Sequence, residues 1–206
     1  ALVERSQLVW PRYFADPVYP TCFGCGMSRQ PGDGLRIFPG AVASRDLWAA
    51  RAPSSTVAQL GTPTSAVGRQ PIQLEHPPYA LAADGTTLWV TSFDDSAVMR
   101  VDTTTSKVVA TINVTHPTGV ALGGGWVWVV EHRDDKLARI DPATNKLVDE
   151  IALGDRGDDD VCGMCVENVV YAFGSAWTAD DFGRSISRVD GTAFAVTTIP
   201  TPLRVW

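Results

Sequence analysis

Apolar residues in the second half of the chain occur in short runs that are separated by turn-forming residues. In the stretch 118–153 these runs are TGVALG, WVWVVE, LARID and KLVDEIAL, with Gly, Asp, Asn and Thr between them. Short apolar or alternating runs bounded by such residues predict β-strands, and the helical period of about 3.6 residues is absent. The pattern therefore predicts four short strands within about forty residues.

The same pattern occurs three times, in segments 88–102, 127–141 and 176–190. In each segment a tryptophan is followed eleven residues later by arginine and thirteen residues later by aspartate. The three sets are Trp89, Arg100 and Asp102; Trp128, Arg139 and Asp141; and Trp177, Arg188 and Asp190. The first two copies are 39 residues apart and the third is displaced by 49, so an insertion precedes the third copy.

Four strands per repeat of about forty residues are typical of a β-propeller blade. We predict a mostly β protein, an incomplete β-propeller of about three four-stranded blades, over residues 74–206. The blades would cover about 74–115, 116–154 and 161–203, and residues 54–62 are a candidate strand of an earlier blade. Because propellers usually have about 4–8 blades, we expect a piece of a larger protein, or self-association through open sheet edges.

The repeat unit, seen in GWVWVVEHRDDKLARIDPATNKLVDEI at 125–151, resembles the YVTN-type propeller repeat over about residues 70–203. That group contains lactonase-like, virginiamycin-lyase-like and extracellular sensor propellers. The resemblance implies the fold and an extracellular or cell-envelope location. It also implies either a non-catalytic binding or sensor role or metal-assisted lactonase-like or lyase-like catalysis, of which we favour the binding role.

Residues 1–57 do not follow the repeat and are predicted to form a turn-rich N-terminal segment, followed by a linker or degenerate blade strand at 58–73. Within the first segment, YPTCFGCGMSRQPGDGLRIFPG at 19–40 resembles the start of hotdog thioesterase-like proteins. This resemblance implies a hotdog-like fragment or arm, with a thioesterase as a third functional alternative.

Charge and hydropathy exclude some partners. The formal net charge is −6 and no cluster of Lys and Arg is present, which argues against nucleic acid or an anionic membrane surface. No apolar run approaches the roughly 20 residues of a membrane span. We therefore expect a protein or a small molecule as the partner, and no transmembrane segment.

The four cysteines form two C-x-x-C pairs, which are Cys22 with Cys25 and Cys162 with Cys165. Disulfides, packed free thiols, a zinc site and a redox pair all fit such spacing, and the sequence does not choose among them.

Two further groups are candidates for ligand or metal binding. His76 and His116 each precede a proline. They are either ligands or acid–base groups at a channel mouth, or part of the turn into a first strand. His132 falls in a turn and is predicted to be solvated. The inserted loop is either a solvated acidic loop or a Ca²⁺ or Mg²⁺ site, formed by Asp155, Asp158, Asp159 and Asp160.

The repeated residues are predicted to be structural. The tryptophans would pack one blade against the next, because a large ring buries much area. The aspartates would cap the turn into the last strand of each blade, and the arginines would lie on the same strand face as the aspartates. Trp126 has no equivalent in the other copies, so it is the aromatic residue most expected to contact a ligand.

Overall fold

A computed structural model describes residues 41–43, 46–51, 54–60, 70–132, 134–153, 166–180 and 185–202. The chain divides into two compact units, residues 1–30 and 31–206, and every described residue belongs to the second unit. Within the described ranges the secondary structure consists almost entirely of strands and turns, with no α-helix. Accordingly, this part of the chain contains no helix of the length and apolarity that crossing a membrane requires.

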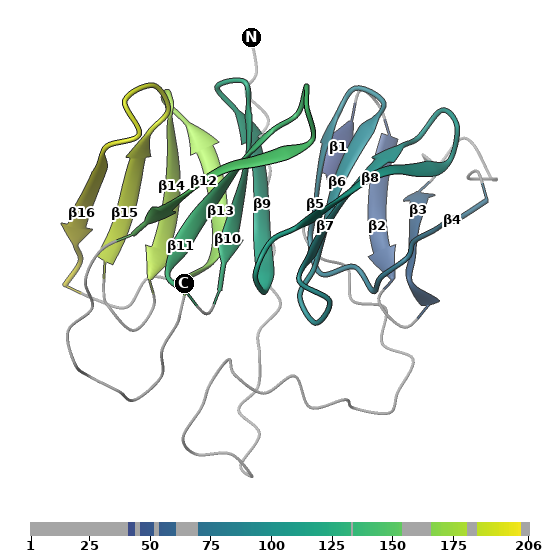
Figure 1. The fold of residues 1–206 in the computed structure, drawn as a ribbon, viewed down its shortest axis with the longest axis horizontal. Coiled ribbons are helices and arrows are strands. Elements are labelled where there is room, and N and C mark those ends of the chain that lie inside the picture. Colours follow the sequence, from purple (N-terminus) through teal and green to yellow (C-terminus); the bar gives the residue numbers. More distant parts are fainter. Residues whose placement is uncertain are drawn as a thin grey trace, which may run out of the picture. The chain divides into compact units, whose positions relative to one another are not determined.

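The strands form four antiparallel sheets, each made of four strands that pair in chain order (Figure 1). Sheet 1 contains β1 (Ala41–Ala43), β2 (Asp46–Arg51), β3 (Thr56–Leu60) and β4 (Ile72–Gln73). Sheet 2 contains β5 (Leu81–Asp84), β6 (Thr87–Ser92), β7 (Ala97–Asp102) and β8 (Lys107–Asn113). Sheet 3 contains β9 (Pro117–Gly123), β10 (Trp126–Glu131), β11 (Lys136–Asp141) and β12 (Lys146–Ala152). Sheet 4 contains β13 (Val166–Ala172), β14 (Ser175–Asp180), β15 (Ser185–Asp190) and β16 (Val196–Pro200).

Burial changes from the second strand of a sheet to its fourth. In β6 and β10 all residues after the first are buried, on both faces of the strand. The outermost strands β8 and β12 are mostly exposed and bury few positions. A strand buried on both faces needs a nearly continuous apolar run, which TLWVTS and WVWVVE provide. Sheets 2 and 3 are thus covered by a neighbouring sheet on each side.

A tryptophan from the second strand of one sheet is the largest side chain in each of the three apolar clusters between sheets. These residues are Trp48, Trp89 and Trp128, each at most 2% exposed. Trp48 clusters with the core of sheet 2, Trp89 with that of sheet 3, and Trp128 with that of sheet 4. Trp89 and Trp128 therefore lie between one sheet and the next.

The fold class is the predicted one, but strands β1 to β4 form a fourth sheet that the repeat count did not include. The predicted boundary at residue 57 falls inside β3, whose neighbours β2 and β4 lie on either side of it in sheet 1. The candidate strand at 54–62 is therefore the third strand of a complete sheet. Sheet 1 was not predicted because it lacks the marker residues of the repeat. It forms nevertheless, because strand pairing requires only alternating apolar residues, which sheet 1 keeps.

Sheet 1 is a degenerate copy of the same unit. Trp48 pairs with Gln59 across β2 and β3, as Trp89 pairs with Arg100 across β6 and β7. The spacing of eleven residues is conserved within the chain, but glutamine replaces arginine and Gly61 stands where aspartate is expected. The dipeptide Leu-Trp at 47–48, repeated at 88–89, was the signal that could have revealed this copy.

Replacing Trp48 with alanine tests whether sheet 1 is packed as a blade. Removal of a fully buried aromatic ring lowers the free energy of unfolding by about 3–5 kcal/mol, which chemical denaturation would measure. The control is Val109→Ala, because Val109 is 52% exposed and its loss should cost little. A Trp48→Ala protein as stable as the control would show that sheet 1 does not dock on sheet 2 through this ring.

Candidate functional site

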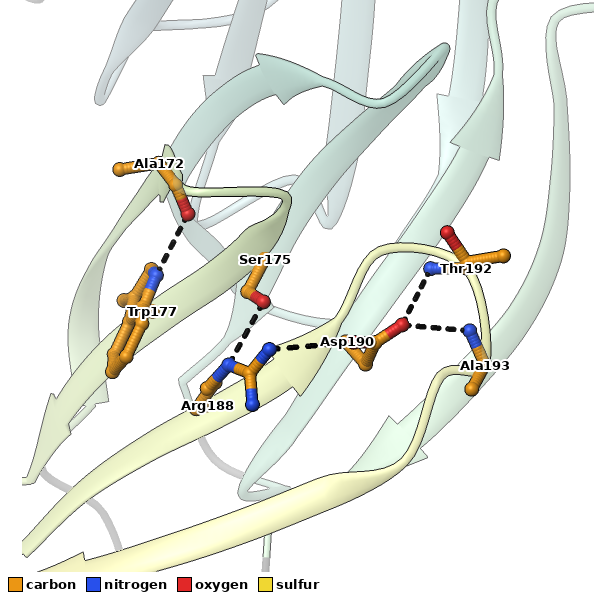
Figure 2. Close-up of polar contacts among 7 residues, drawn as sticks. All are labelled: Ala172, Ser175, Trp177, Arg188, Asp190, Thr192 and Ala193. Atoms are coloured by element: carbon orange, nitrogen blue, oxygen red, sulfur yellow. Dashed lines mark hydrogen bonds and ion pairs between the residues drawn. The ribbon is translucent and has the colours of Figure 1, made fainter.

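The repeated aspartates close the turn between the third and fourth strands. The Asp190 carboxylate accepts hydrogen bonds from the backbone N–H groups of Thr192 and Ala193 at 2.9 and 2.8 Å (Figure 2). The N–H groups of Ala193 and Thr192 also hold the pKa of Asp190 below its ordinary value. Equivalent turn bonds are accepted by Asp102 and Asp141. This is the turn-capping role expected from the sequence.

The arginine of sheet 2 reaches across to the turn of sheet 3. Arg100 Nη1 donates to the carbonyl oxygen of Pro142 at 2.7 Å and to Asn145 Oδ1 at 2.8 Å. Its guanidinium lies 5.4 Å from the centre of the Trp89 ring. Arg100 and Trp89 therefore form one unit that packs against the β11–β12 turn of the next sheet.

The arginine of sheet 3 meets the equivalent turn of sheet 4, but its partners there are aromatic. Phe194 stands four residues after Asp190, as Asn145 stands four residues after Asp141. The guanidinium of Arg139 lies 3.5 Å from the centre of the Phe194 ring. Arg139 is 6% exposed and donates from Nε and Nη2 to the two carboxylate oxygens of Asp149 at 3.0 and 2.7 Å.

Two further rings complete the interface between sheets 3 and 4. Tyr171 stacks on Trp128 with ring centres 6.1 Å apart. Trp126 lies 4.4 Å from the Arg139 guanidinium and meets Phe194 edge-on at 6.2 Å. Trp126, the residue that was expected to contact a ligand, thus has a packing role on this side, and it also lines a cleft on the other side of sheet 3.

In sheet 4 the tryptophan and arginine bond within their own sheet. Figure 2 shows Arg188 Nε donating to Ser175 Oγ at 2.9 Å and Nη2 paired with Asp190 Oδ2 at 3.3 Å. Trp177 Nε1 donates to the Ala172 carbonyl at 2.9 Å, as Trp128 does to the residue five positions before it.

The face of sheet 4 that carries Trp177 exposes apolar side chains. Val170 pairs directly with Trp177 across β13 and β14, so the two share this face, and Val170 is 59% exposed. Ile199, which pairs with Ile186 on the same face, is 40% exposed. None of the four described sheets packs on this face. The self-association expected from an uncovered sheet stays a prediction.

A cleft of about 480 Å³ lies between sheets 2 and 3. Its walls come from β5, β6 and β7 of sheet 2, and from β9, β10 and the turns that follow β9 and β11 in sheet 3. The lining residues include Asp84, Thr87, Trp89, Arg100, Leu122, Gly123, Trp126 and Pro142. A concave space of this size with aromatic walls, one cation and a few polar groups has the character of a small-molecule site.

The histidines gather at the opposite end of β6 and β10 from the cleft. The Phe93 ring lies between His116 and His132, with ring centres 5.2 and 5.7 Å away. His76 instead faces Asp95, with Nδ1 3.5 Å from Oδ2. A shared ligand or acid–base role for His76 and His116 stays a prediction.

The prediction that His132 is solvated is wrong. His132 is only 6% exposed, because its ring packs edge-on against Phe93 and Nδ1 lies 3.2 Å from the carbonyl oxygen of Val166. The turn that follows β10 is thus covered by the start of sheet 4.

Glu131 is a buried carboxyl group that the sequence reasoning did not single out. It has no exposed surface, and its Oε1 accepts a hydrogen bond from the Thr115 N–H at 3.2 Å. Burial and then the neighbouring carboxylate of Glu150 raise the pKa of Glu131 to about 7, while Lys136 opposes the shift. The position of Glu131 at the end of WVWVVE, on the strand face of Val127 and Val129, was the available signal.

Within the described ranges, no group of three or more His, Cys, Asp or Glu side chains is close enough to hold a metal ion. The other predicted metal or disulfide residues lie outside those ranges, so their roles stay predictions. They are Cys22, Cys25, Asp155, Asp158, Asp159, Asp160, Cys162 and Cys165.

The chain matches no protein-family model, and no curated protein matches it in sequence. Its fold, however, is that of solved β-propeller proteins. A catalytically inactive virginiamycin B lyase from Staphylococcus aureus, solved with quinupristin, superposes with a TM-score of 0.68 at 16% identity, over 84% of this chain and 58% of that one. A streptogramin B lyase gives a TM-score of 0.67 at 18% identity, over 84% and 57%. AztD from Citrobacter koseri gives 0.61 at 16% identity, over 82% and 48%.

This chain is a β-propeller module. It spans little more than half of the length of the two lyases. At these identities the likeness shows the fold alone.

The raised pKa of Glu131 predicts a pH dependence of stability. A carboxyl group with an ordinary pKa of 4.5 and a folded-state pKa of about 7 binds its proton more tightly in the folded protein. Its stabilising effect is complete below pH 4.5 and is lost as the pH rises through 7. The loss is on the order of 3 kcal/mol.

Glu131→Gln removes the titrating group and keeps its shape. The difference in unfolding free energy between the variant and the wild type, measured by denaturation from pH 4 to 8, should change across this window in favour of the variant. A difference that is constant with pH would contradict the account.

Proposed function

We propose that this module is a non-catalytic β-propeller that binds a small molecule in the cleft between sheets 2 and 3. The single observation that carries the proposal is the contrast between two equivalent interfaces. The space beside Arg139 is filled by Phe194 and Tyr171, whereas the space beside Arg100 is an open cleft of about 480 Å³. A concave space of this size that is lined by aromatic rings and one cation is typical of small-molecule sites, so we take its shape and chemistry as those of a binding site.

The walls of the cleft support binding rather than mere loose packing. Trp89 is fixed in the core, and Arg100 is held by the two hydrogen bonds that it donates to the next sheet. Rigid walls of this kind lose little conformational entropy when a ligand binds. Thr87 and the exposed Asp84 add polar groups at the mouth of the cleft.

The lyase-like alternative depends on other residues. Glu131, with its pKa of about 7, and the nearby His116 and His132 are the acid–base groups that such an activity would use. Glu131 is fully buried, so we favour the binding role. The thioesterase alternative depends on residues outside the described ranges.

Asn145→Phe tests the proposed site by placing in the cleft the ring that Phe194 places beside Arg139. Asn145 and Phe194 have nearly the same left-handed φ, 57° and 58°, so the substitution copies a residue that the neighbouring turn already accommodates. Phenol, benzylamine and phenylpropionate, measured by ligand-observed NMR, serve as probes. At least one should bind the wild type and lose about tenfold or more in affinity in the variant.

The matched control is Ser106→Phe, at the same position and φ in the turn of sheet 2, outside the cleft. It should bind the probes like the wild type. If none of the probes bound the wild type, or if both variants weakened binding equally, the cleft would not be the binding site.

A further inference from the structure

We propose that the ligand of this cleft is a small carboxylate that carries an aromatic ring on a short flexible chain. The inference rests on the proposed function, since it names the ligand class of the same cleft. It comes from the two groups that surround Arg139 in the interface between sheets 3 and 4 and that Arg100 lacks in the interface between sheets 2 and 3.

The first missing group is a second aromatic ring on the guanidinium, since Arg139 contacts two rings and Arg100 contacts only the Trp89 ring among the described residues. Phe194 lies over Arg139 at 3.5 Å, but the equivalent residue beside Arg100 is Asn145, which occupies only one end of the guanidinium through Nη1. Leu122 likewise replaces Tyr171, six residues before the repeat tryptophan. The cleft thus lies at the place that two aromatic rings occupy in the next interface. A ligand ring could fill this place, because a ring over a guanidinium is a favourable contact.

The second missing group is a carboxylate. Arg139 pairs across β11 and β12 with Asp149, which binds its Nε and Nη2. Arg100 pairs across β7 and β8 with Ala110, and its buried Nε has no hydrogen-bond partner. Among the described residues, Arg100 forms hydrogen bonds only to a carbonyl and an amide oxygen. A ligand carboxylate would neutralise a charge that the protein leaves unpaired.

The arrangement also selects the shape of the ligand. Around Arg139 the ring lies on the face of the guanidinium and the carboxylate lies at its edge, in two separate side chains. A single ligand that replaces both needs a flexible link between ring and carboxylate. Phenylpropionate has such a link, whereas benzoate holds the two groups rigidly in one plane.

One wall of the cleft restricts where the ring can lie. Gly123 stands five residues before Trp128, and a Cβ there would overlap the Tyr171 ring. Asp84 stands at the equivalent position before Trp89 and has a Cβ, so a ring cannot take the place of Tyr171 fully and is directed over Arg100. The Asp84 carboxylate is exposed and opposes an anionic ligand, so Asp84→Asn should strengthen binding modestly.

The experiment measures the affinity of the purified chain for four probes by isothermal titration calorimetry. Phenylpropionate should bind at least tenfold more tightly than benzoate, than phenylpropanol, which lacks the charge, and than propionate, which lacks the ring. Equal affinities for phenylpropanol and phenylpropionate would overturn the inference while leaving a cleft that binds neutral aromatics. Absence of binding by all four probes, and by the phenol and benzylamine used with Asn145→Phe, would overturn the proposed function itself.

Ala110→Asp provides the second test, because it gives Arg100 the internal carboxylate that Asp149 gives Arg139. It should weaken phenylpropionate binding by roughly 10-fold to 100-fold, the effect of losing a charged hydrogen-bonded pair, and leave phenylpropanol unchanged. Val109→Asp, on the adjacent and 52% exposed position of β8, adds the same charge on the other strand face and should retain binding. Equal effects of the two variants would show that net charge alone weakens binding. That result would overturn the proposal that Arg100 binds the carboxylate of the ligand.

Discussion

The structure depends on the burial of one tryptophan ring from each of sheets 1, 2 and 3 in the core of the next sheet. A four-stranded sheet of this size cannot bury its own apolar faces, so each face needs a neighbour. Trp48, Trp89 and Trp128 each lie in one of those inter-sheet contacts, and each is almost completely buried. Trp177 is held in the same way within its own sheet, on a face that no described sheet covers. Each sheet is therefore stable only as part of the series.

The arginines beside Trp89 and Trp128 each meet one turn of the next sheet, and the variation of that turn makes the two interfaces chemically different. Asn145 and Phe194 occupy the same place four residues after the turn aspartate, with the same backbone conformation. One leaves a cleft beside Arg100 and the other covers Arg139 with a ring. In this chain the repeated scaffold determines the position of the proposed binding surface, and a few unrepeated residues determine its chemistry.

The fold followed from the sequence because its signal is repeated. Three copies of the same tryptophan, arginine and aspartate spacing identified the strands and the inter-sheet role of the rings. The fourth copy was missed because Gln59 and Gly61 replaced the two polar markers while the apolar pattern persisted. The cleft was not predictable, because it depends on the contact between Arg100 and Asn145, which lie 45 residues apart in the sequence. The burial of Glu131 and of His132 was not predictable for the same reason, since it comes partly from neighbouring elements. The raised pKa of Glu131 follows from that burial.

The docking of an arginine on the turn of the next sheet is the central claim, and a double-mutant cycle between Arg100 and Asn145 tests it most directly. The unfolding free energies of Arg100→Met, Asn145→Ala and the double variant would be compared with that of the wild type. A charged hydrogen bond across the interface predicts a coupling energy of about 1 kcal/mol or more. A coupling energy indistinguishable from zero would show that the two side chains do not interact in the folded protein and would contradict the account of how the sheets are joined.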